Sequence, residues 1–304
     1  TDGIWLISTA TGNTIGGSAA GAGNIISGNN NSGVYLELAG NNTIQGNLIG
    51  TDAAGTGSIA NTFYGINVNN AASNTIGGST ANERNVISGN TDAGIMLFGA
   101  STTLNQIQGN YIGVDANGNT ALGNNDDGII IGGGANNNTI GGDRTAGEGN
   151  VISGNTGAQV DGIEINDAGS NNNKIYGNYI GTNFDGSVAI ANTRHGVVIY
   201  NQVQGTEVGG TGTGQGNIIS GNGDAGVIID GAGQATTSGN VIVANFIGTN
   251  AAGTGDLGNT TDGIAIFGGA QNNTIGGNTV SHRNIISGND NDGIWITGSG
   301  TDSN

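Results

Sequence analysis

Carboxylates recur in one kind of loop at four places along the chain. Each loop follows the pattern [TV]-[DN]-x-x-G-x-x-x-[IL]-[AG]-N. Asp and Asn oxygens are ligands that Ca²⁺ accepts, and the segment DANGN from Asp115 is the closest to an Asp-x-Asn-Gly calcium turn. No Glu follows at a fixed offset to complete such a site, so an Asx turn that only shapes the loop is the favoured alternative. The candidate calcium ligands are Asp52, Asp115, Asp185 and Asp256.

A second set of carboxylates comes just before a recurring Gly-Ile or Gly-Val segment. Its members are Asp92, Asp127, Asp161, Asp224, Asp262 and Asp292. If these residues stack, each pair repels by about 1 kcal/mol even at the dielectric constant of water, which a cation or solvation would relieve. His195 takes the place of an Asp in this set and follows Arg194, so we expect the two to relieve charge between Asp161 and Asp224. No Ser or Cys nucleophile pairs recognisably with His195, and we assign no catalytic residue.

The composition excludes several classes of partner. The 304 residues include 64 Gly, no Pro and no Cys, and 22 Asp and Glu stand against five Lys and Arg. A net charge of -17 argues against nucleic acid, which is bound through clusters of cations. The longest apolar run is about four residues, far short of the ~18 that span a bilayer, so we expect no membrane insertion.

The elements that must position these residues are repeats. The segment NTIGG begins at Asn13, Asn74, Asn138 and Asn273, with a degenerate copy, TEVGG, at Thr206, and the copies lie about 61 to 68 residues apart. A half-repeat such as NTIQGNLIGTD, from Asn42, lies between them, so two coils make one repeat. Each coil carries three short apolar segments, and the pattern G-[IV]-x-[IVL] of the third occurs ten times.

Short strands cannot bury a face alone, whereas stacked coils align their Ile residues into columns. We therefore predict an all-β fold: a single parallel β-helix (β-solenoid) spanning residues 1–304, with about ten coils and three strands per coil. We expect the solenoid to be right-handed, because connections between parallel strands of one sheet are almost always right-handed. The Asn that opens the first segment recurs once per coil, which predicts a ladder of stacked amides that Thr206 interrupts.

At coil spacing, the phrases N-x-I-x-G-N and D-G-I-x-I resemble the right-handed parallel β-helix repeats of pectate-lyase-like proteins. The variant IGTDAAGTG resembles repeat arrays of bacterial surface and adhesin proteins, and the resemblance covers essentially the whole chain. It implies the fold rather than one activity, because this fold hosts lyases, hydrolases and passive stalks. Lyases of this architecture use Arg or Lys bases beside Asp residues that hold calcium. Arg84, Arg144 and Arg283 lie in odd-coil loops and form no such constellation.

We therefore predict a non-catalytic structural fibre, stalk or adhesin segment that gives rigid extension at the cell surface or outside the cell. The ends carry no polar cap, so we expect a segment of a longer array or a filament subunit, whose partner is the same chain continued or a second copy stacked end to end. Apart from the candidate Ca²⁺, no cofactor is expected. The alternative is a carbohydrate-active or carbohydrate-binding β-helix, lyase-like or hydrolase-like, with a polysaccharide partner. A one-off charged cluster would favour that alternative, and Arg194 and His195 are the one such feature.

Overall fold

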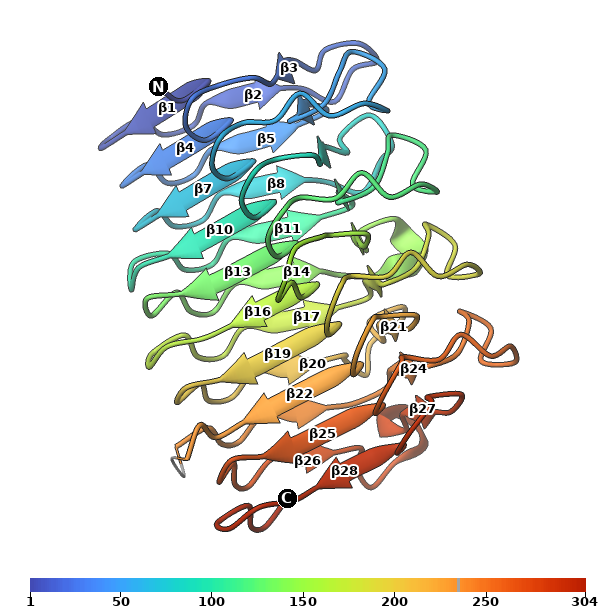
Figure 1. Ribbon diagram of the computed structural model, residues 1–304. Coiled ribbons are helices and arrows are strands. Elements are labelled where there is room, and N and C mark those ends of the chain that lie inside the picture. Colours follow the sequence, from blue (N-terminus) through green and yellow to red (C-terminus); the bar gives the residue numbers. More distant parts are fainter. Residues whose placement is uncertain (234–235) are drawn as a thin grey trace.

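The computed structural model describes residues 1–233 and 236–304, and within them the chain is a parallel β-solenoid (Figure 1). Successive strands along the chain enter three different sheets in turn, and each strand pairs in parallel with the strands of the coils above and below. The predicted fold class is confirmed. Two 3-10 helices, η1 (Arg144–Ala146) and η2 (Val280–His282), interrupt the loops, and within the described ranges no helix is both long and apolar enough to span a membrane.

The first sheet has ten strands and is called the ten-strand sheet below. It corresponds to the ten predicted G-[IV]-x-[IVL] segments, because the Gly of each segment stands directly before a strand. In order its strands are β1 (Ile4–Ile7), β4 (Val34–Glu37), β7 (Ile66–Asn69), β10 (Ile95–Phe98), β13 (Ile129–Gly132), β16 (Ile163–Ile165), β19 (Val197–Tyr200), β22 (Val227–Asp230), β25 (Ile264–Phe267) and β28 (Ile294–Ile296).

The second and third sheets have nine shorter strands each. The second contains β2 (Thr14–Gly16), β5 (Thr43–Gln45), β8 (Thr75–Gly77), β11 (Gln106–Gln108), β14 (Thr139–Gly141), β17 (Lys174–Tyr176), β20 (Glu207–Val208), β23 (Val241–Ile242) and β26 (Thr274–Ile275). The third contains β3 (Ile25–Ile26), β6 (Leu48–Ile49), β9 (Val86–Ile87), β12 (Tyr111–Ile112), β15 (Val151–Ile152), β18 (Tyr179–Ile180), β21 (Ile218–Ile219), β24 (Phe246–Ile247) and β27 (Ile285–Ile286).

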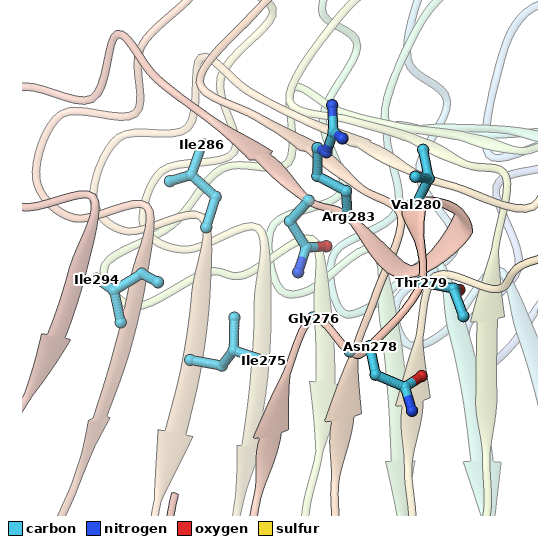
Figure 2. Close-up of a pocket in the computed structure, with 10 residues that line it drawn as sticks. Ile275, Gly276, Asn278, Thr279, Val280, Arg283, Ile286 and Ile294 are labelled. Atoms are coloured by element: carbon cyan, nitrogen blue, oxygen red, sulfur yellow. The ribbon is translucent and has the colours of Figure 1, made fainter.

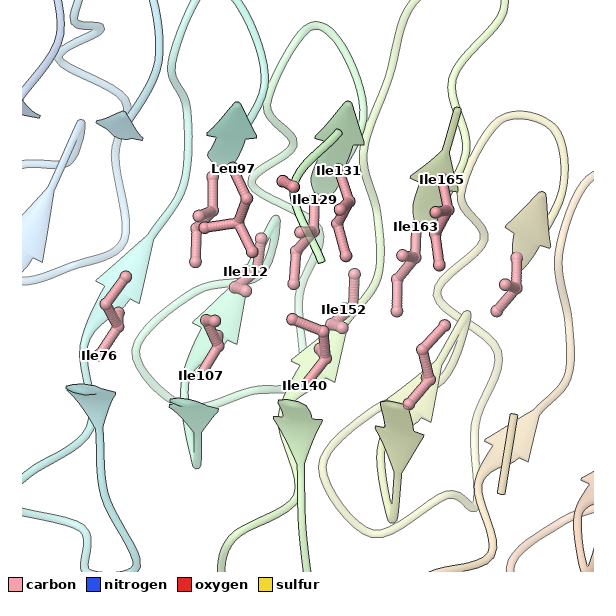
Figure 3. Packing of buried hydrophobic residues seen from close by; sticks show 14 of the residues in the cluster. Ile76, Leu97, Ile107, Ile112, Ile129, Ile131, Ile140, Ile152, Ile163 and Ile165 are labelled. Atoms are coloured by element: carbon pink, nitrogen blue, oxygen red, sulfur yellow. The ribbon is translucent and has the colours of Figure 1, made fainter. Parts of the chain in front are cut away.

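The core lies inside the coil and consists of aliphatic columns (Figure 3). In β13, Ile129 and Ile131 point inward and are fully buried, while Ile130 lies on the outer face, as expected from the two-residue period of a strand. Ile140 and Ile152 of the same coil complete the cross-section. Burying one such side chain contributes roughly 1.5–3 kcal/mol, so each coil adds a similar increment to a continuous core.

Three ladders of buried Asn side chains run along the solenoid. The predicted ladder is present, for example in the bond from Asn105 Nδ2 to Asn138 Oδ1 (2.9 Å), and it breaks at Thr206, whose Oγ1 has no hydrogen-bond partner. Two further ladders were not predicted, although the two Asn residues of N-[IV]-I-S-G-N belong to them. They contain Asn24, Asn47, Asn85, Asn110, Asn150, Asn178, Asn217, Asn245 and Asn284, and Asn29, Asn61, Asn90, Asn124, Asn155, Asn192, Asn222, Asn259 and Asn289.

The loops of the even coils cover bulky residues of the third sheet. A Cβ added to Gly118 would lie 2.7 Å from Cζ of the Tyr111 ring, so a glycine fits where no side chain would. The aliphatic residues of these loops, Ile59, Leu122, Ile190 and Leu257, are expected to fold back over these groups, because both sets would otherwise be exposed apolar stripes. Ile190 does so, in a small buried cluster with Tyr111, whereas Ile59 is 49% exposed and that part of the expectation is wrong.

Candidate functional site

The four predicted calcium ligands lie in the even-coil loops and accept hydrogen bonds from the loop backbone. Asp52 Oδ1 accepts from the N–H groups of Thr56 (2.9 Å) and Ala54 (3.2 Å), which lowers the pKa of Asp52, and Asp115 Oδ1 accepts from Asn119 N (3.0 Å). In the other two loops Asn183 and Asn250 accept the equivalent bonds. The turn therefore requires an acceptor oxygen rather than a charge.

Asp185 and Asp256 take other places in their loops. Asp185 Oδ1 accepts from Ser187 N (3.0 Å), and Asp256 Oδ1 accepts from Gly258 N (3.2 Å). The four carboxylates thus do not occupy one equivalent position. Ca²⁺ binding at Asp52, Asp115, Asp185 and Asp256 stays a prediction.

A different group of carboxylates gathers on the outer side of the ten-strand sheet. Oxygens of Asp127, Asp161 and Glu164 lie within 4.8 Å of one another, and this is the group of three that the described residues offer to a metal ion. Asp127 is 3% exposed and Asp161 is 0% exposed. Because Ile163 and Ile165 of β16 point into the core, the alternation of the strand places Glu164 on the outer face.

Burial changes the charge of this group. Desolvation, reinforced by the neighbouring charge of Asp161, raises the pKa of Asp127 to about 9, so this carboxyl is neutral at pH 7. Desolvation also raises the pKa of Glu164. Two carboxyl groups in this cluster therefore bind a proton more tightly than an exposed carboxyl does.

Arg194 provides the positive charge. Its Nε donates to Asp161 Oδ1 (2.9 Å) and its Nη2 donates to Asp161 Oδ2, a two-bond pairing of guanidinium and carboxylate. Asp161 Oδ1 also accepts from His195 N (3.0 Å). Arg194 offsets the charge of Asp161 as expected, whereas His195 lies beside Asp224 with its pKa lowered by burial and supplies no charge there at neutral pH. Asp224 and Asp92 stand one residue earlier in their coils than the other Asp residues of that set.

His195 is held in one orientation. Its Nδ1 accepts a hydrogen bond from Ala225 N (3.1 Å), so the neutral ring carries its hydrogen on Nε2, which lies 3.7 Å from Asp224 Oδ2. Desolvation lowers the pKa of His195. At neutral pH the ring is therefore a neutral hydrogen-bond donor through Nε2.

Tyr200 connects the next strand to Glu164. Its hydroxyl donates to Glu164 Oε1 (3.2 Å), and Asn166 Nδ2 donates to the same oxygen. Burial and the charge of Glu164 raise the pKa of Tyr200 to about 12, so the hydroxyl keeps its proton. Glu164 is thus fixed by two donors that both reach Oε1.

Glu164, Arg194, His195 and Tyr200 line one cleft of ≈ 330 Å³ on the outer face of β16, β19, β22 and β25. Strand register brings the residues together, because Glu164 pairs with Val198 and then Ile228, and Tyr200 pairs with Asp230 and then Phe267. One part of the cleft is charged or polar and another is apolar. The complete lining is Gln159, Glu164, Arg194, His195, Val198, Tyr200, Ile228, Asp230 and Phe267.

Glu164 was missed by sequence analysis as a site residue, whereas Tyr200 is one of the aromatic residues that the sequence offers for stacking on a sugar ring, with Trp5, Tyr35, Tyr64 and Trp295. A signal was present for Glu164, because it is the one charged residue at the outward position of the ten G-[IV]-x-[IVL] segments. The sequence did not show that Tyr200 reaches Glu164, because that contact is made between neighbouring coils.

A larger cavity of ≈ 820 Å³ lies at the C-terminal end of the solenoid and has a different character (Figure 2). Ile275, Ile286 and Ile294 of the last coil border it, and Arg283 is the one charged residue among its described lining. This is the exposed end of the aliphatic core rather than a site with acid or base groups. The expected end-to-end association stays a prediction.

Comparisons with known proteins bear on the fold. No family model and no curated protein matches the chain. Among solved structures, it is similar to the A-module of the mannuronan C-5 epimerase AlgE4 of Azotobacter vinelandii, with a TM-score of 0.44 and 15% identity over 100% of this chain and 84% of that one. It is also similar to the A-module of the epimerase AlgE6 of the same organism, with a TM-score of 0.37 and 16% identity over 99% of this chain and 83% of that one.

Two predictions are corrected: that the chain is a non-catalytic fibre, stalk or adhesin segment, and that it is not an enzyme. Both neighbours are named as mannuronan C-5 epimerases. The cleft points the same way, because it is the one-off charged cluster that was expected to favour a carbohydrate-active β-helix. The identity is low and the likeness concerns the fold alone, so an activity must be argued from this chain's own residues.

Proposed function

We propose that this chain is a carbohydrate-active β-solenoid, which binds a polysaccharide in the cleft and performs acid–base chemistry on a bound sugar with Glu164. The observation that carries the proposal is the convergence of Glu164, Arg194, His195 and Tyr200 on one cleft. Burying ionisable groups costs free energy. A cleft that gathers several ionisable groups with shifted pKa values is therefore a candidate for a binding or catalytic site.

The lining of the cleft is suited to a sugar ring. Sugars present hydroxyl groups at their edges and C–H groups on their faces. Arg194 Nη1 and His195 Nε2 are donors for the edges, and the Tyr200 oxygen, whose hydrogen goes to Glu164, is an acceptor. Val198, Ile228 and Phe267 give an apolar surface for a face. A ligand without both kinds of surface would leave part of this lining unmatched.

Glu164 is the candidate general acid or base. Its raised pKa brings the carboxyl nearer to the neutral range in which one residue can both give and take a proton. Since Tyr200 and Asn166 both donate to Oε1, Oε2 is the atom from which a proton can pass to a sugar oxygen or carbon. Asp230 lines the same cleft and supplies a second carboxylate, the usual requirement for cleaving a glycosidic bond.

A bound Ca²⁺ is a separate part of the proposal. Asp127, Asp161 and Glu164 offer oxygen ligands that suit this ion. Two observations argue against a Ca²⁺ ion there. Arg194 already pairs with Asp161, and a proton neutralises Asp127 at pH 7. Thermal unfolding of the wild type and of Asp127→Asn, with Ca²⁺ and with a chelator, decides between a cation and a proton at this position.

The test is a panel of neutral and acidic polysaccharides incubated with the wild type, Glu164→Gln and a matched variant. Hydrolysis is read as new reducing ends, elimination as unsaturated sugars, and epimerisation as deuterium uptake from D₂O. We expect Glu164→Gln to lower the rate by 10²-fold or more, a typical contribution of a general acid or base. Asp290→Asn also removes one carboxylate, but from an exposed loop outside the cleft, and it should keep wild-type activity. Equal activity of wild type and Glu164→Gln, or no turnover and no binding of any polysaccharide, would overturn the proposal.

A further inference from the structure

A second groove lies on the outer face of the ten-strand sheet, toward its N-terminal strands. It has a volume of ≈ 270 Å³ and is lined by Tyr64, Asn67, Asn69, Met96 and Phe98, which belong to β7, β10 and the residues before β7. The cleft containing Glu164 is on the same face of the same sheet, because Asn67, Met96, Ile130 and Glu164 follow one another in strand register.

The groove contains a polar atom that lacks a partner. Asn67 Oδ1 is buried and accepts no hydrogen bond from the described residues. Leaving such an acceptor unpaired costs about 1–3 kcal/mol, whereas a hydroxyl group of a ligand would satisfy it. The second amide of the groove is paired, because Asn69 Nδ2 donates to the Tyr35 hydroxyl (3.2 Å).

Next to the groove stands a pair of aromatic rings. Trp5 of β1 and Tyr35 of β4 are in register, and their rings are stacked with centroids 6.1 Å apart and an interplanar angle of 6°. Trp5 is 55% exposed. Tyr35 in turn lies in register with Asn67, so the ring pair and the groove form one surface across β1, β4, β7 and β10. Flat exposed rings are the side chains against which the C–H face of a sugar packs.

The spacing connects this surface to the cleft. Parallel strands lie about 4.8 Å apart, so β16 is about 14 Å from β7 and about 24 Å from β1. Between them, β13 presents only Ile130 and Gly132 on its outer face. An extended glycan crossing the strands can therefore occupy the cleft and the aromatic pair at the same time.

The charges around the groove identify the kind of sugar. Burial, and after it the charges of Asp92 and Asp126, raise the pKa of the Tyr64 hydroxyl, and Glu37 lies on the outer face of β4 beside Tyr35. The described lining of the groove contains no Lys or Arg. A chain of negatively charged sugars would be repelled here, whereas uncharged sugars meet the aromatic rings and the free amide oxygen without that cost.

We infer that the outer face of β1, β4, β7 and β10 is a binding track for uncharged sugar residues of a polysaccharide, continuous with the cleft. The inference rests on the proposed function for the link to the Glu164 site, but the binding itself can be measured separately. Trp5 and Tyr35 pack against sugar faces, and Asn67 Oδ1 accepts a hydrogen bond from a sugar hydroxyl.

The experiment measures affinity of the Glu164→Gln protein for defined neutral oligosaccharides of increasing length (glucan, xylan and mannan series) and for matched uronate oligosaccharides. Adding Trp5→Ala or Asn67→Leu should weaken binding of long neutral oligosaccharides by about tenfold each, the loss expected for one ring contact or one buried hydrogen bond. Short oligosaccharides that fill only the cleft should be unaffected. Phe184→Ala, which removes a 43% exposed aromatic residue from a loop between β18 and β19, is the control and should change neither affinity.

The outcomes separate this inference from the proposed function. If long neutral oligosaccharides bind both variants with unchanged affinity, the binding track is overturned. The proposed function of the cleft still holds in that case if Glu164→Gln abolishes turnover. Preferred binding of uronate oligosaccharides overturns the assignment to uncharged sugars. A self-association equilibrium that Trp5→Ala abolishes, with no change in glycan affinity, identifies the occupant as a second copy of the chain and also overturns the inference. Circular dichroism and melting curves of each variant confirm that it is folded.

Discussion

The carboxyl groups of this chain behave according to their place in the coil. Asp52 lies in an exposed loop, where backbone N–H groups lower its pKa, whereas Asp127 lies beneath the outer face, where burial raises its pKa to about 9. The carboxyl group of Asp52 is thus charged and stabilises a turn, whereas that of Asp127 is protonated and neutral. Glu164 lies between these extremes because it is only partly buried, which suits a residue that must exchange a proton.

At the residue scale, Asp127 should make stability depend on pH. Its pKa is higher in the folded chain than the ordinary value of 3.8, so the folded state binds the proton more tightly. Its contribution is therefore complete below about pH 4 and is lost as the pH rises toward 9. With a chelator present, the melting temperature of the wild type should fall between pH 5 and pH 9. The fall should be smaller for Asp127→Asn, whose amide oxygen can still accept the Asp161 N–H.

Melting curves of the two proteins, measured at matched ionic strength, check this expectation. Asp143→Asn, a change in an exposed loop where the pKa is lowered, is the control and should not reduce the alkaline loss of stability. The same pH slope for wild type and Asp127→Asn would show that Asp127 is charged in the folded chain.

At the scale of the coil, the Asn ladders account for the ordered corners. Each buried Asn accepts from the Asn before it and donates to the Asn after it, as Asn110 does from Asn85 and to Asn150. The ladders continue although the loops between them differ in length, because only the corner residues must repeat. A ladder position that is not Asn interrupts the chain of amides, and at Thr206 the hydroxyl of the replacing residue has no hydrogen-bond partner.

Replacing Thr206 with Asn should therefore stabilise the solenoid. The new amide can accept from Asn173 and donate toward Asn240, which restores hydrogen bonds worth about 1–2 kcal/mol in the free energy of unfolding. Chemical denaturation measures the change. Thr206→Val removes the unpaired hydroxyl without adding an amide, so it should stabilise less than Thr206→Asn. A lower stability of Thr206→Asn than of wild type would mean that the corner has no room for the amide.

At the scale of the whole molecule, the charge of -17 is spread along a thin rod rather than over a sphere. Stacking places like charges of successive coils near one another, and only five Lys and Arg are available to offset them. This self-repulsion opposes the compact state. It also discourages polyanionic partners, in agreement with a track for uncharged sugars.

Salt should consequently stabilise the fold. Raising NaCl from about 0.01 M to about 0.15 M shortens the screening length from about 30 Å to about 8 Å. We expect the melting temperature to rise by about 2 °C or more. Replacing NaCl with an uncharged osmolyte of equal osmolarity separates screening from solute exclusion. A melting temperature that falls with NaCl would show that favourable ion pairs outweigh the repulsion.

The sequence by itself determined the fold, because the solenoid repeats local information. The Ile at fixed positions, the opening Asn and the Gly at the corners recur from coil to coil. Coils with the same pattern stack on one another, so the pattern of one coil is sufficient to predict the solenoid. The break at Thr206 and the outward place of Glu164 could also be read directly. The carbohydrate-active alternative was recognised, but the fibre was preferred because regular repeats conceal a single irregular cluster.

Only the tertiary structure decided where the cleft is and how its groups are charged. The alignment of the coils predicts that Arg194 offsets Asp161, but it does not predict that Tyr200 reaches Glu164 from 36 residues away. Because the loops vary in length from coil to coil, sequence spacing does not say which side chains face each other across neighbouring strands. The burial that raises the pKa of Asp127 and lowers that of His195 depends on those contacts. The pattern of one coil predicts the core, but chemistry on the surface arises between coils, where only packing sets the distances.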